Sequence, residues 1–214
     1  MPTKVYLIGT IHCDLKGSER LEKLLNLYKP DVIIKECGPD KPIVPEHLND
    51  LPQDELIKIL KEKNPNIDVN YKTLCMVLLN GAYEDKISDG YSKRNNIKIL
   101  TIDDPVICNG IVKETTDITK NVNINTLADF RLSPNEFIKN TDFEYKEHRI
   151  ALPNEAGTVR EILWENEVRR HEGVIVGIFG LLHIYGKHHN LYDRLSDLDV
   201  ERILLCDSDK IQPA

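Results

Sequence analysis

Two histidines stand in the same sequence context near opposite ends of the chain. The motif GTIH ends at His12 and directly follows the apolar run 5–8, and the motif GLLH ends at His183 and directly follows the apolar run 174–179. A third Gly-x-x-His match ends at His189 but follows no apolar run, so the bare pattern means little without a strand before it. Imidazole transfers protons near neutral pH and is the commonest metal ligand in proteins. The first two histidines are therefore candidates for an acid–base or metal site.

Acidic side chains follow two further predicted strands. Glu36 comes after the apolar run 32–34, and Asp103 comes after the run 97–102. In open parallel sheets, ligands bind outside the carboxyl ends of the strands, so we expect both carboxylates to lie near the two histidines. Imidazoles and carboxylates together are what a metal site or an acid–base site requires. The competing interpretation is that the histidines are merely hydrogen-bonded within loops.

Three segments of the chain resemble the TraB/PrgY/GumN superfamily. The segments are 7–12 (LIGTIH), 29–37 (KPDVIIKEC) and 180–186 (GLLHIYG). That superfamily includes the Tiki metalloproteases and is related to the erythromycin esterases and the haem-binding ChaN proteins. Its pattern is two GxxH motifs, a glutamate that closes the second strand, and an arginine ahead of the second GxxH. The resemblance covers both ends and the middle of the chain but not residues 106–153.

Three more residues match this pattern, one of them with a departure. Glu84 resembles the family's GxE segment, and Asp103 resembles the aspartate that ends the next strand. Arg160 stands at about the expected interval before the second GxxH. The family arginine is usually followed by asparagine, whereas this chain has Glu161. The alternatives for the arginine are Arg169 and Arg170, or a surface role in which Arg160 only pairs with glutamates along its helix.

The resemblance implies a divalent-metal hydrolase that acts on peptide or similar amide bonds. It implies that His12, Glu36 and His183 surround the metal, and nitrogen and oxygen donors of this kind suit Mn²⁺, Co²⁺, Fe²⁺ or Zn²⁺. The metal would lower the pKa of its bound water and polarise the scissile carbonyl. Glu84 or Asp103 would take the proton of that water. Arg160 would stabilise the oxyanion or hold a carboxylate of the substrate.

Three other functions remain open at this stage. In a metal-independent hydrolase like the erythromycin esterases, His12 or His183 would be the general base, oriented by Glu36, with Arg160 as the electrostatic element. A non-catalytic protein would use the same residues to bind a metal, haem or a peptide. In the last of these alternatives, the site has lost its activity. The argument for it is the altered arginine motif.

The cysteines and the other histidines are weaker candidates for functional residues. The five cysteines are scattered without a CxxC pair, which argues against a disulfide framework or a zinc knuckle and favours free thiols. Cys13 and Cys37 flank candidate residues, but neighbours along a strand face opposite sides, so a thiol nucleophile is not expected. Solvent-exposed positions are expected for the other histidines, which are His47, His148, His171, His188 and His189. The alternative for His188 and His189 is that they add metal ligands from the loop after the second motif.

Alternating strands and helices predict an α/β fold. We expect a mainly parallel central sheet flanked by helices, built from two βαβ-type halves, as a single domain over residues 1–214. Residues 106–153 show weak periodicity and are expected to form an irregular or helical insertion or cap. Predicted strands cover 5–8, 32–34, 97–102, 174–179 and 200–206. Predicted helices cover 18–28, 54–63, 71–83, a further helix that runs on towards 94, 155–170 and 191–195.

Two predictions concern single helices. Ser18 is the expected N-cap of the first helix, because serine oxygens accept hydrogen bonds from free backbone amides. The helix 155–170 is expected to turn Val159, Ile162 and Leu163 towards the core. No GxGxxG or GxxxxGK[ST] motif is present, so the chain lacks the common nucleotide-binding fingerprints.

Composition narrows the classes of partner. The chain has 214 residues, 41% hydrophobic and 29% charged, with a net charge of −7, which argues against nucleic acid and against an anionic membrane surface. No apolar run approaches the ~20 residues of a membrane span, and the first residues lack the pattern of a signal peptide. We therefore expect a cytoplasmic protein with a small-molecule or peptide substrate. Its oligomeric state does not follow from the sequence.

Overall fold

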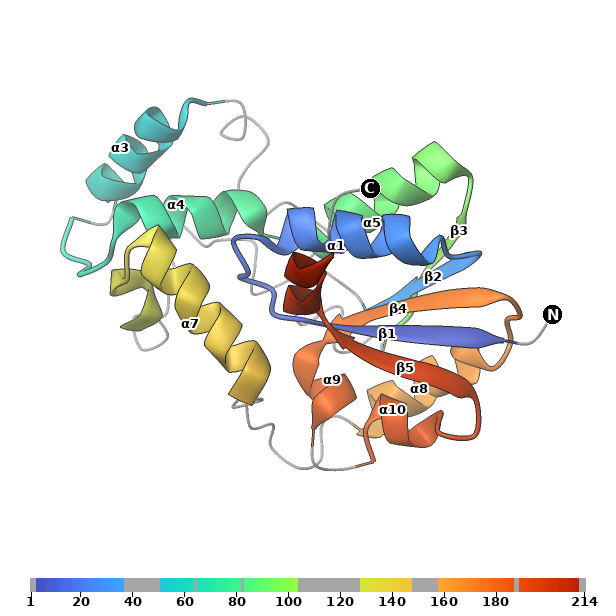
Figure 1. Cartoon of the computed structure of the whole chain (residues 1–214). Helices are drawn as coiled ribbons and strands as arrows, with labels where there is room; N and C mark the ends of the chain where they lie inside the picture. Colours follow the sequence, from blue (N-terminus) through green and yellow to red (C-terminus); the bar gives the residue numbers. More distant parts are fainter. Residues whose placement is uncertain are drawn as a thin grey trace.

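The computed structural model describes residues 3–36, 51–63, 65–81, 83–103, 128–147, 158–186 and 189–211. Its centre is a five-stranded sheet in the order β3-β2-β4-β1-β5 (Figure 1). Each pair of neighbouring strands is parallel. The predicted α/β fold with a parallel sheet is confirmed. The strands are β1 (Lys4–Thr10), β2 (Val32–Lys35), β3 (Lys98–Thr101), β4 (Val174–Gly180) and β5 (Asp199–Leu204).

The strand order brings the two ends of the chain together. β1 and β4 lie side by side in the middle of the sheet, with Thr10 opposite Gly180 in the register. β4 also separates β1 from β2, so the two strands of the first expected βαβ unit are parallel but are not direct neighbours. Both central strands are apolar on both faces, as strands covered by helices on two sides must be.

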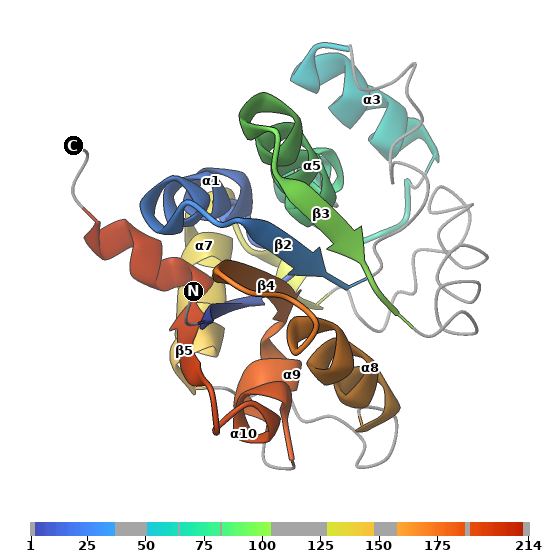
Figure 2. The ribbon, with the colours of Figure 1, turned by 90° about the vertical axis from the view of Figure 1, so that its right-hand side faces the viewer.

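Helices cover both faces of the sheet (Figure 2). On one face, α1 (Gly17–Tyr28), α5 (Tyr83–Asn95) and the 3-10 helix η3 (Leu205–Lys210) surround a core that includes Ile8, Ile33 and Val176. On the other face, α8 (Thr158–Val168), α9 (Leu181–Tyr185) and α10 (Leu191–Arg194) surround a second core that includes Leu7 and Phe179.

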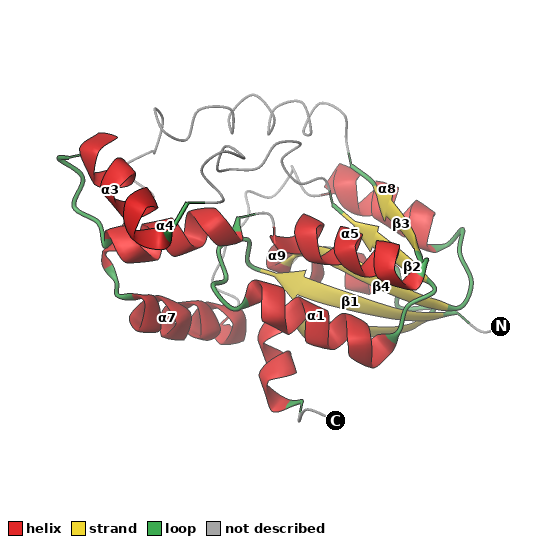
Figure 3. Ribbon diagram, turned by 90° about the horizontal axis from the view of Figure 1, so that it is seen from above, coloured by secondary structure: helices red, strands yellow, loops and turns green. Residues whose placement is uncertain are grey.

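A group of helices lies beyond the carboxyl ends of the strands (Figure 3). It consists of α3 (Gln53–Lys63), α4 (Tyr71–Asn80), the 3-10 helix η2 (Ala128–Arg131) and α7 (Pro134–Glu147). α3 and α4 share a separate small core of Leu56, Leu60, Leu74 and Cys75, against which Phe130 packs. η2 and α7 show that the described part of the predicted 106–153 insertion is helical; residues 104–127 and 148–157 lie outside the described residues.

Two local predictions for helices are wrong. α1 begins at Gly17 without a side-chain cap, and the hydroxyl of Ser18 lies 3.4 Å from Oδ1 of Asn80 instead. α8 turns a face towards the core that differs from the predicted one. Val159 is 56% and Ile162 is 41% exposed, whereas Trp164 is fully buried. The inward face of α8 carries charged groups because it borders the candidate site, and a hydrophobic pattern cannot indicate such a face. No helix in the described ranges is both long and apolar enough to cross a membrane.

Candidate functional site

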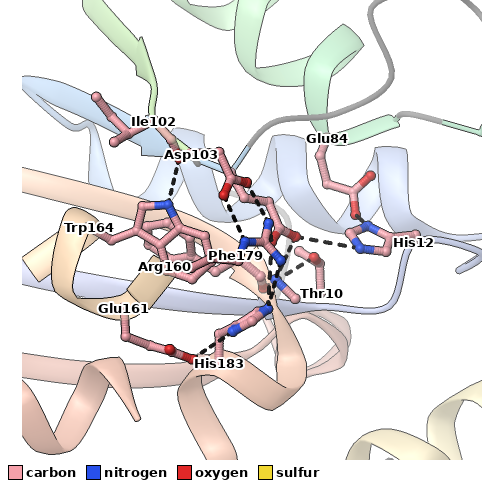
Figure 4. A network of polar contacts seen from close by, with 12 residues as sticks. Thr10, His12, Glu84, Ile102, Asp103, Arg160, Glu161, Trp164, Phe179 and His183 are labelled. Atoms are coloured by element: carbon pink, nitrogen blue, oxygen red, sulfur yellow. Dashed lines mark hydrogen bonds and ion pairs between the residues drawn. The ribbon is translucent and has the colours of Figure 1, made fainter. Parts of the chain in front are cut away.

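The register between β1 and β4 places both GxxH turns at the same edge of the sheet. Figure 4 shows that His12, Glu84, Asp103, Arg160 and His183 gather there. They come from the turn after β1, the first turn of α5, the end of β3, α8 and α9. Glu36 follows β2 directly and completes the cluster through contacts with both histidines. The structure therefore brings all six sequence-predicted site residues together, as the rule for carboxyl ends of parallel strands requires.

Glu36 is the centre of this cluster. Its Oε1 accepts a hydrogen bond from the amide of Gly180 at 2.9 Å and lies 3.5 Å from Nε2 of His12. Its Oε2 accepts a hydrogen bond from Nη2 of Arg160 at 3.1 Å and lies 3.9 Å from Nε2 of His183. The carboxylate thus has one histidine beside each of its two oxygens.

His12 pairs with Glu84. Nδ1 of His12 lies 2.8 Å from Oε1 of Glu84, and the imidazole is 69% exposed. Burial among the surrounding groups lowers the pKa of His12, but the Glu84 carboxylate and then Glu36 outweigh this effect and raise the pKa to about 9. Burial likewise disfavours ionised Glu84, but His12 reverses the balance and holds the pKa of Glu84 below its usual value. Both partners are therefore charged at neutral pH, and water screens their attraction at the exposed side of the ring.

Buried hydrogen bonds fix the turn that carries His12. The amide of Ile11 donates to the hydroxyl of Tyr145 at 3.0 Å, and that hydroxyl lies 3.1 Å from Oδ2 of Asp14. Asp14 also accepts from Nη1 of Arg20 at 2.8 Å, and the Tyr83 hydroxyl donates to the carbonyl of Ile11 at 3.2 Å. Because Tyr145 belongs to α7, the helical insertion contributes directly to the geometry of the turn.

His183 is buried and held on both ring nitrogens. Nδ1 lies 2.7 Å from Oε1 of Glu161, and Nε2 lies 3.3 Å from Nη1 of Arg160. The indole of Trp164 meets the imidazole edge-on, with ring centroids 4.8 Å apart. His183 lies in α9 rather than in a loop, and three side chains of α8 enclose its ring.

Arg160 is an internal cation of the site rather than a surface residue. Its Nε donates to Oδ1 of Asp103 at 2.7 Å and its Nη2 to Oδ2, so the pair is bidentate. Asp103 has a fully buried side chain, and the guanidinium lies over the Trp164 ring at 4.8 Å from its centroid. Burial opposes the charge of Arg160, but Asp103 and Glu36 outweigh it and raise the pKa of Arg160.

The alternative arginines lie outside the cluster. Arg169 bonds to Glu165 and Asp197, and Arg170 bonds to Glu167. All these contacts are on α8 or in the loop between α10 and β5. Of the three candidate arginines, Arg160 is thus the one that lies in the cluster.

Sequence reasoning missed three features of the site. Glu161 and Trp164 both contact His183. A signal for Glu161 existed, because it stands where the motif of the superfamily that the chain resembles has asparagine. Lys35, next to Glu36, points to the other side of the strand, where it pairs with Asp85 and, at 3.1 Å, with Asp89. This buried lysine connects β2, which leads to Glu36, with α5, which carries Glu84.

The other predicted residues have ordinary surroundings. Cys13, Cys75 and Cys206 are free thiols, and burial raises the pKa of Cys206 to about 11, so it is no reactive thiolate. His189 is exposed as expected, whereas His171 is only 15% exposed because its ring packs beside Glu167. Cys37, Cys108, His47, His148 and His188 lie outside the described residues.

Comparison with known proteins gives no relative. No protein-family model, curated protein or solved structure matches this chain. The resemblance to the TraB/PrgY/GumN superfamily therefore rests on the short motifs and remains a prediction.

The donor set suits a divalent cation in chemistry and in charge. Each histidine has a carboxylate at Nδ1 and turns Nε2 towards Glu36, which is the arrangement that orients metal-ligating histidines. Within the described part of the chain, four carboxylates of the cluster (Glu36, Glu84, Asp103 and Glu161) face two cationic groups, protonated His12 and Arg160. Such an excess of buried negative charge is costly unless a cation balances it.

The same donors are not gathered around one point. Among the described residues, no group of three histidine, cysteine or acidic side chains is placed to hold a metal ion. Arg160 explains this for His183, because its Nη1 contacts the Nε2 that would face the ion. A cation held by both histidines and Glu36 therefore requires Arg160 to release His183 and His12 to give up its proton.

Proposed function

We propose that this protein hydrolyses peptide or amide bonds at the Glu36 cluster with the help of a bound divalent cation. The observation that carries the proposal is the convergence of His12 and His183 on the two oxygens of one carboxylate. Side chains from opposite ends of the chain meet in this way although neither the sheet nor its cores need them there. A buried acidic cluster that also holds an arginine is costly for folding, so we attribute it to chemistry.

The cation would be held by His12, Glu36 and His183, whose nitrogen and oxygen donors suit Mn²⁺, Co²⁺, Fe²⁺ or Zn²⁺. When bound, it would activate a water molecule and polarise the scissile carbonyl. The carboxylates at Nδ1 of the two histidines support this assignment, because they fix the orientation of each ring. Nε2 of both rings points towards Glu36, and that of His183 becomes available once Arg160 releases it.

Arg160 supplies positive charge next to the reacting carbonyl. Asp103 binds two edges of its guanidinium and Trp164 covers one face, so the side chain is oriented before substrate arrives. A preorganised donor of this kind stabilises a developing oxyanion or binds a carboxylate of the substrate. Asp103 therefore acts on Arg160 and not on the water.

Of the two carboxylates considered as proton acceptors, Glu84 suits the role better than Asp103. Asp103 has a fully buried side chain with both oxygens bonded to Arg160, whereas Glu84 is 13% exposed at the open side of His12. Glu84 combines this role with the orientation of His12, whose Nδ1 it contacts.

A metal-independent hydrolase is the second candidate, and the position of Arg160 favours it. The guanidinium already contacts both Glu36 and His183. In this version, protonated His12 serves as the general acid, since Glu84 and Glu36 raise its pKa to about 9. His183 serves as the base through its unprotonated Nε2, oriented by Glu161 rather than by Glu36 as the sequence led us to expect.

The test combines metal analysis with turnover. The full chain is purified without a polyhistidine tag, its metal content is measured by mass spectrometry, and fluorogenic peptides and nitrophenyl esters are offered with and without EDTA. The proposal predicts one equivalent of metal, loss of that metal in His12→Ala and His183→Ala, and peptide hydrolysis that EDTA abolishes. Glu36→Gln removes turnover, while the control His171→Ala changes neither property, because His171 contacts Glu167 away from the cluster.

Two results would change this assignment. Turnover that survives EDTA in a metal-free protein supports the metal-independent candidate. Absence of hydrolysis across both panels, with metal bound or not, contradicts both hydrolases and leaves a binding protein.

A further inference from the structure

Helix α8 surrounds His183 with three side chains. Arg160 reaches Nε2, Glu161 reaches Nδ1, and Trp164 lies against the ring, as Figure 4 shows. Arg160 has further contacts with Glu36 and Asp103. The hydrogen bond of Glu161 goes to Nδ1 of His183, and its negative charge also favours the charged form of Arg160.

These contacts determine the position of the imidazole proton. A guanidinium has only donors, so Nε2 of His183 must accept from Nη1 of Arg160 across their 3.3 Å separation. A carboxylate has acceptors only when ionised, so Nδ1 must donate to Oε1 of Glu161 across 2.7 Å. His183 is therefore a neutral imidazole with its proton on Nδ1, and its Nε2 lone pair faces the Glu36 side of the cluster.

Folding alone gives little reason for the carboxylate at position 161. Glu161 is 5% exposed, and its Oε2 is buried without a hydrogen-bond partner among the described residues. Burying a carboxylate with one oxygen unpaired costs free energy. A glutamine would make the same hydrogen bond to Nδ1 without burying a charge. The glutamate must therefore contribute something other than stability.

We propose that Glu161 is a positioning residue that fixes His183 in the Nδ1-protonated form and so presents Nε2 to substrate or ligand. The purpose of this arrangement rests on the proposed function, but the arrangement itself is a property of the resting protein. In this role, the ionised carboxylate strengthens the hydrogen bond to Nδ1 and makes Nε2 a better electron donor. The buried Oε2, which has no hydrogen-bond partner within the described part of the chain, lowers the stability of the fold, and the protein tolerates this loss in order to keep the charge at Nδ1.

The test is ¹⁵N NMR of the histidine rings in the full chain as purified, which needs no substrate. The His183 signals are identified by their loss in His183→Gln. Wild type should show protonated Nδ1 and unprotonated Nε2 in a single form. Glu161→Leu should lose this preference and show a mixture of both tautomers. Glu161→Gln should keep the form but shift the Nδ1 proton upfield, because an amide oxygen is a weaker acceptor than a carboxylate.

Glu165→Gln on the same helix is the matched control, since Glu165 bonds to Arg169 and Arg194 and not to His183. Its His183 signals should equal those of wild type. Thermal melts separate positioning from structural support, because Glu161→Gln should unfold no lower than wild type, whereas a structural role would lower its Tm by about 4 °C or more. If the metal analysis above finds an ion, its affinity should fall about 10- to 100-fold in Glu161→Gln.

Three results would overturn the inference. They are a wild-type His183 protonated on Nε2, an unchanged tautomer in Glu161→Leu, and a destabilised Glu161→Gln whose Nδ1 proton has not moved. None of them depends on hydrolysis, so the inference can fail while the proposed function stands, and it can hold in a protein that hydrolyses nothing.

Discussion

Thr10 and Gly180 are register partners across β1 and β4, although they lie near opposite ends of the chain. This pairing starts both GxxH turns at the same level of the sheet and lets Glu36 contact both histidines. Three residues earlier in β4, Gly177 pairs with Leu7. The missing side chain at Gly177 leaves room for the ring of Phe179 and a methyl group of Leu7.

Gly177→Ala should destabilise the protein. A Cβ at this position would lie 2.5 Å from the Phe179 ring and 3.0 Å from a Leu7 methyl group. Overpacking of this kind costs about 1–3 kcal/mol, which exceeds the roughly 0.4–1 kcal/mol gained by restricting the unfolded chain. Urea unfolding monitored by circular dichroism measures the difference.

Gly90→Ala is the matched control for this substitution. Gly90 lies inside α5, and a Cβ there meets only the flexible Nη1 of Arg94, at 3.3 Å. A helix-interior alanine should stabilise the protein by roughly 0.5–1 kcal/mol. If both alanines shift stability in the same direction, the role given to Gly177 is wrong.

Asp103→Ala should be strongly destabilising. The substitution leaves the largely buried guanidinium of Arg160 with Glu36 as its remaining carboxylate. Removing one partner of a buried ion pair costs about 3–5 kcal/mol, and the contact with Glu36 places the expected loss near the lower value. The free energy of unfolding in urea is the measurement.

Asp197→Ala provides the comparison at an exposed arginine pair. Asp197 is 63% exposed and bonds to Arg169, and exposed ion pairs contribute little to stability. If both substitutions lowered the free energy of unfolding equally, Asp103 would not be the group that compensates the buried charge of Arg160.

The sequence predicted the site residues that follow the strands better than those on helix α8. Apolar runs identified the strands, and the rule for parallel sheets then predicted that His12, Glu36, Asp103 and His183 meet. The strand order could not be predicted, because the position of β4 between β1 and β2 depends on contacts between segments that are distant in the sequence. A local pattern does not contain such contacts.

The inward face of α8 shows why the rest of the site was missed. Hydrophobic periodicity favoured Val159 and Ile162, which are exposed, over Arg160 and Glu161, which are largely buried. Charged side chains are buried because they pair with other polar groups, and not because their transfer out of water is favourable. Those partners, Asp103 and His183, come from other elements, so no periodicity along α8 identifies them.

Ligands of the site should change the fluorescence of Trp164. This residue is the single tryptophan of the chain, and it contacts both Arg160 and His183. Under the proposed function, adding Co²⁺ should quench its emission, since the ion would bind next to the indole. The titration is followed in wild type and in His183→Ala, which should lose the saturable part. Saturable quenching that is unchanged in His183→Ala would place the ion elsewhere.

The pairing of His12 with Glu84 should be visible as a shifted titration. Glu84 and Glu36 outweigh burial and raise the pKa of His12 to about 9. Glu84→Gln removes the nearer charge, so the pKa of His12 should move down towards the ordinary value of about 6.5. Because the folded-state pKa lies above the unfolded value, the pair stabilises the fold fully below about pH 6.5 and loses this contribution as the pH rises through about 9. The NMR signal of the His12 ring carbon and its proton follows the titration in metal-free protein, and thermal melts at pH 6 and pH 10 follow the stability. Wild type should lose more Tm than Glu84→Gln between these two pH values. A His12 that titrates near 6.5 in wild type would contradict the ion pair and, with it, the general-acid role of His12 in the metal-independent candidate.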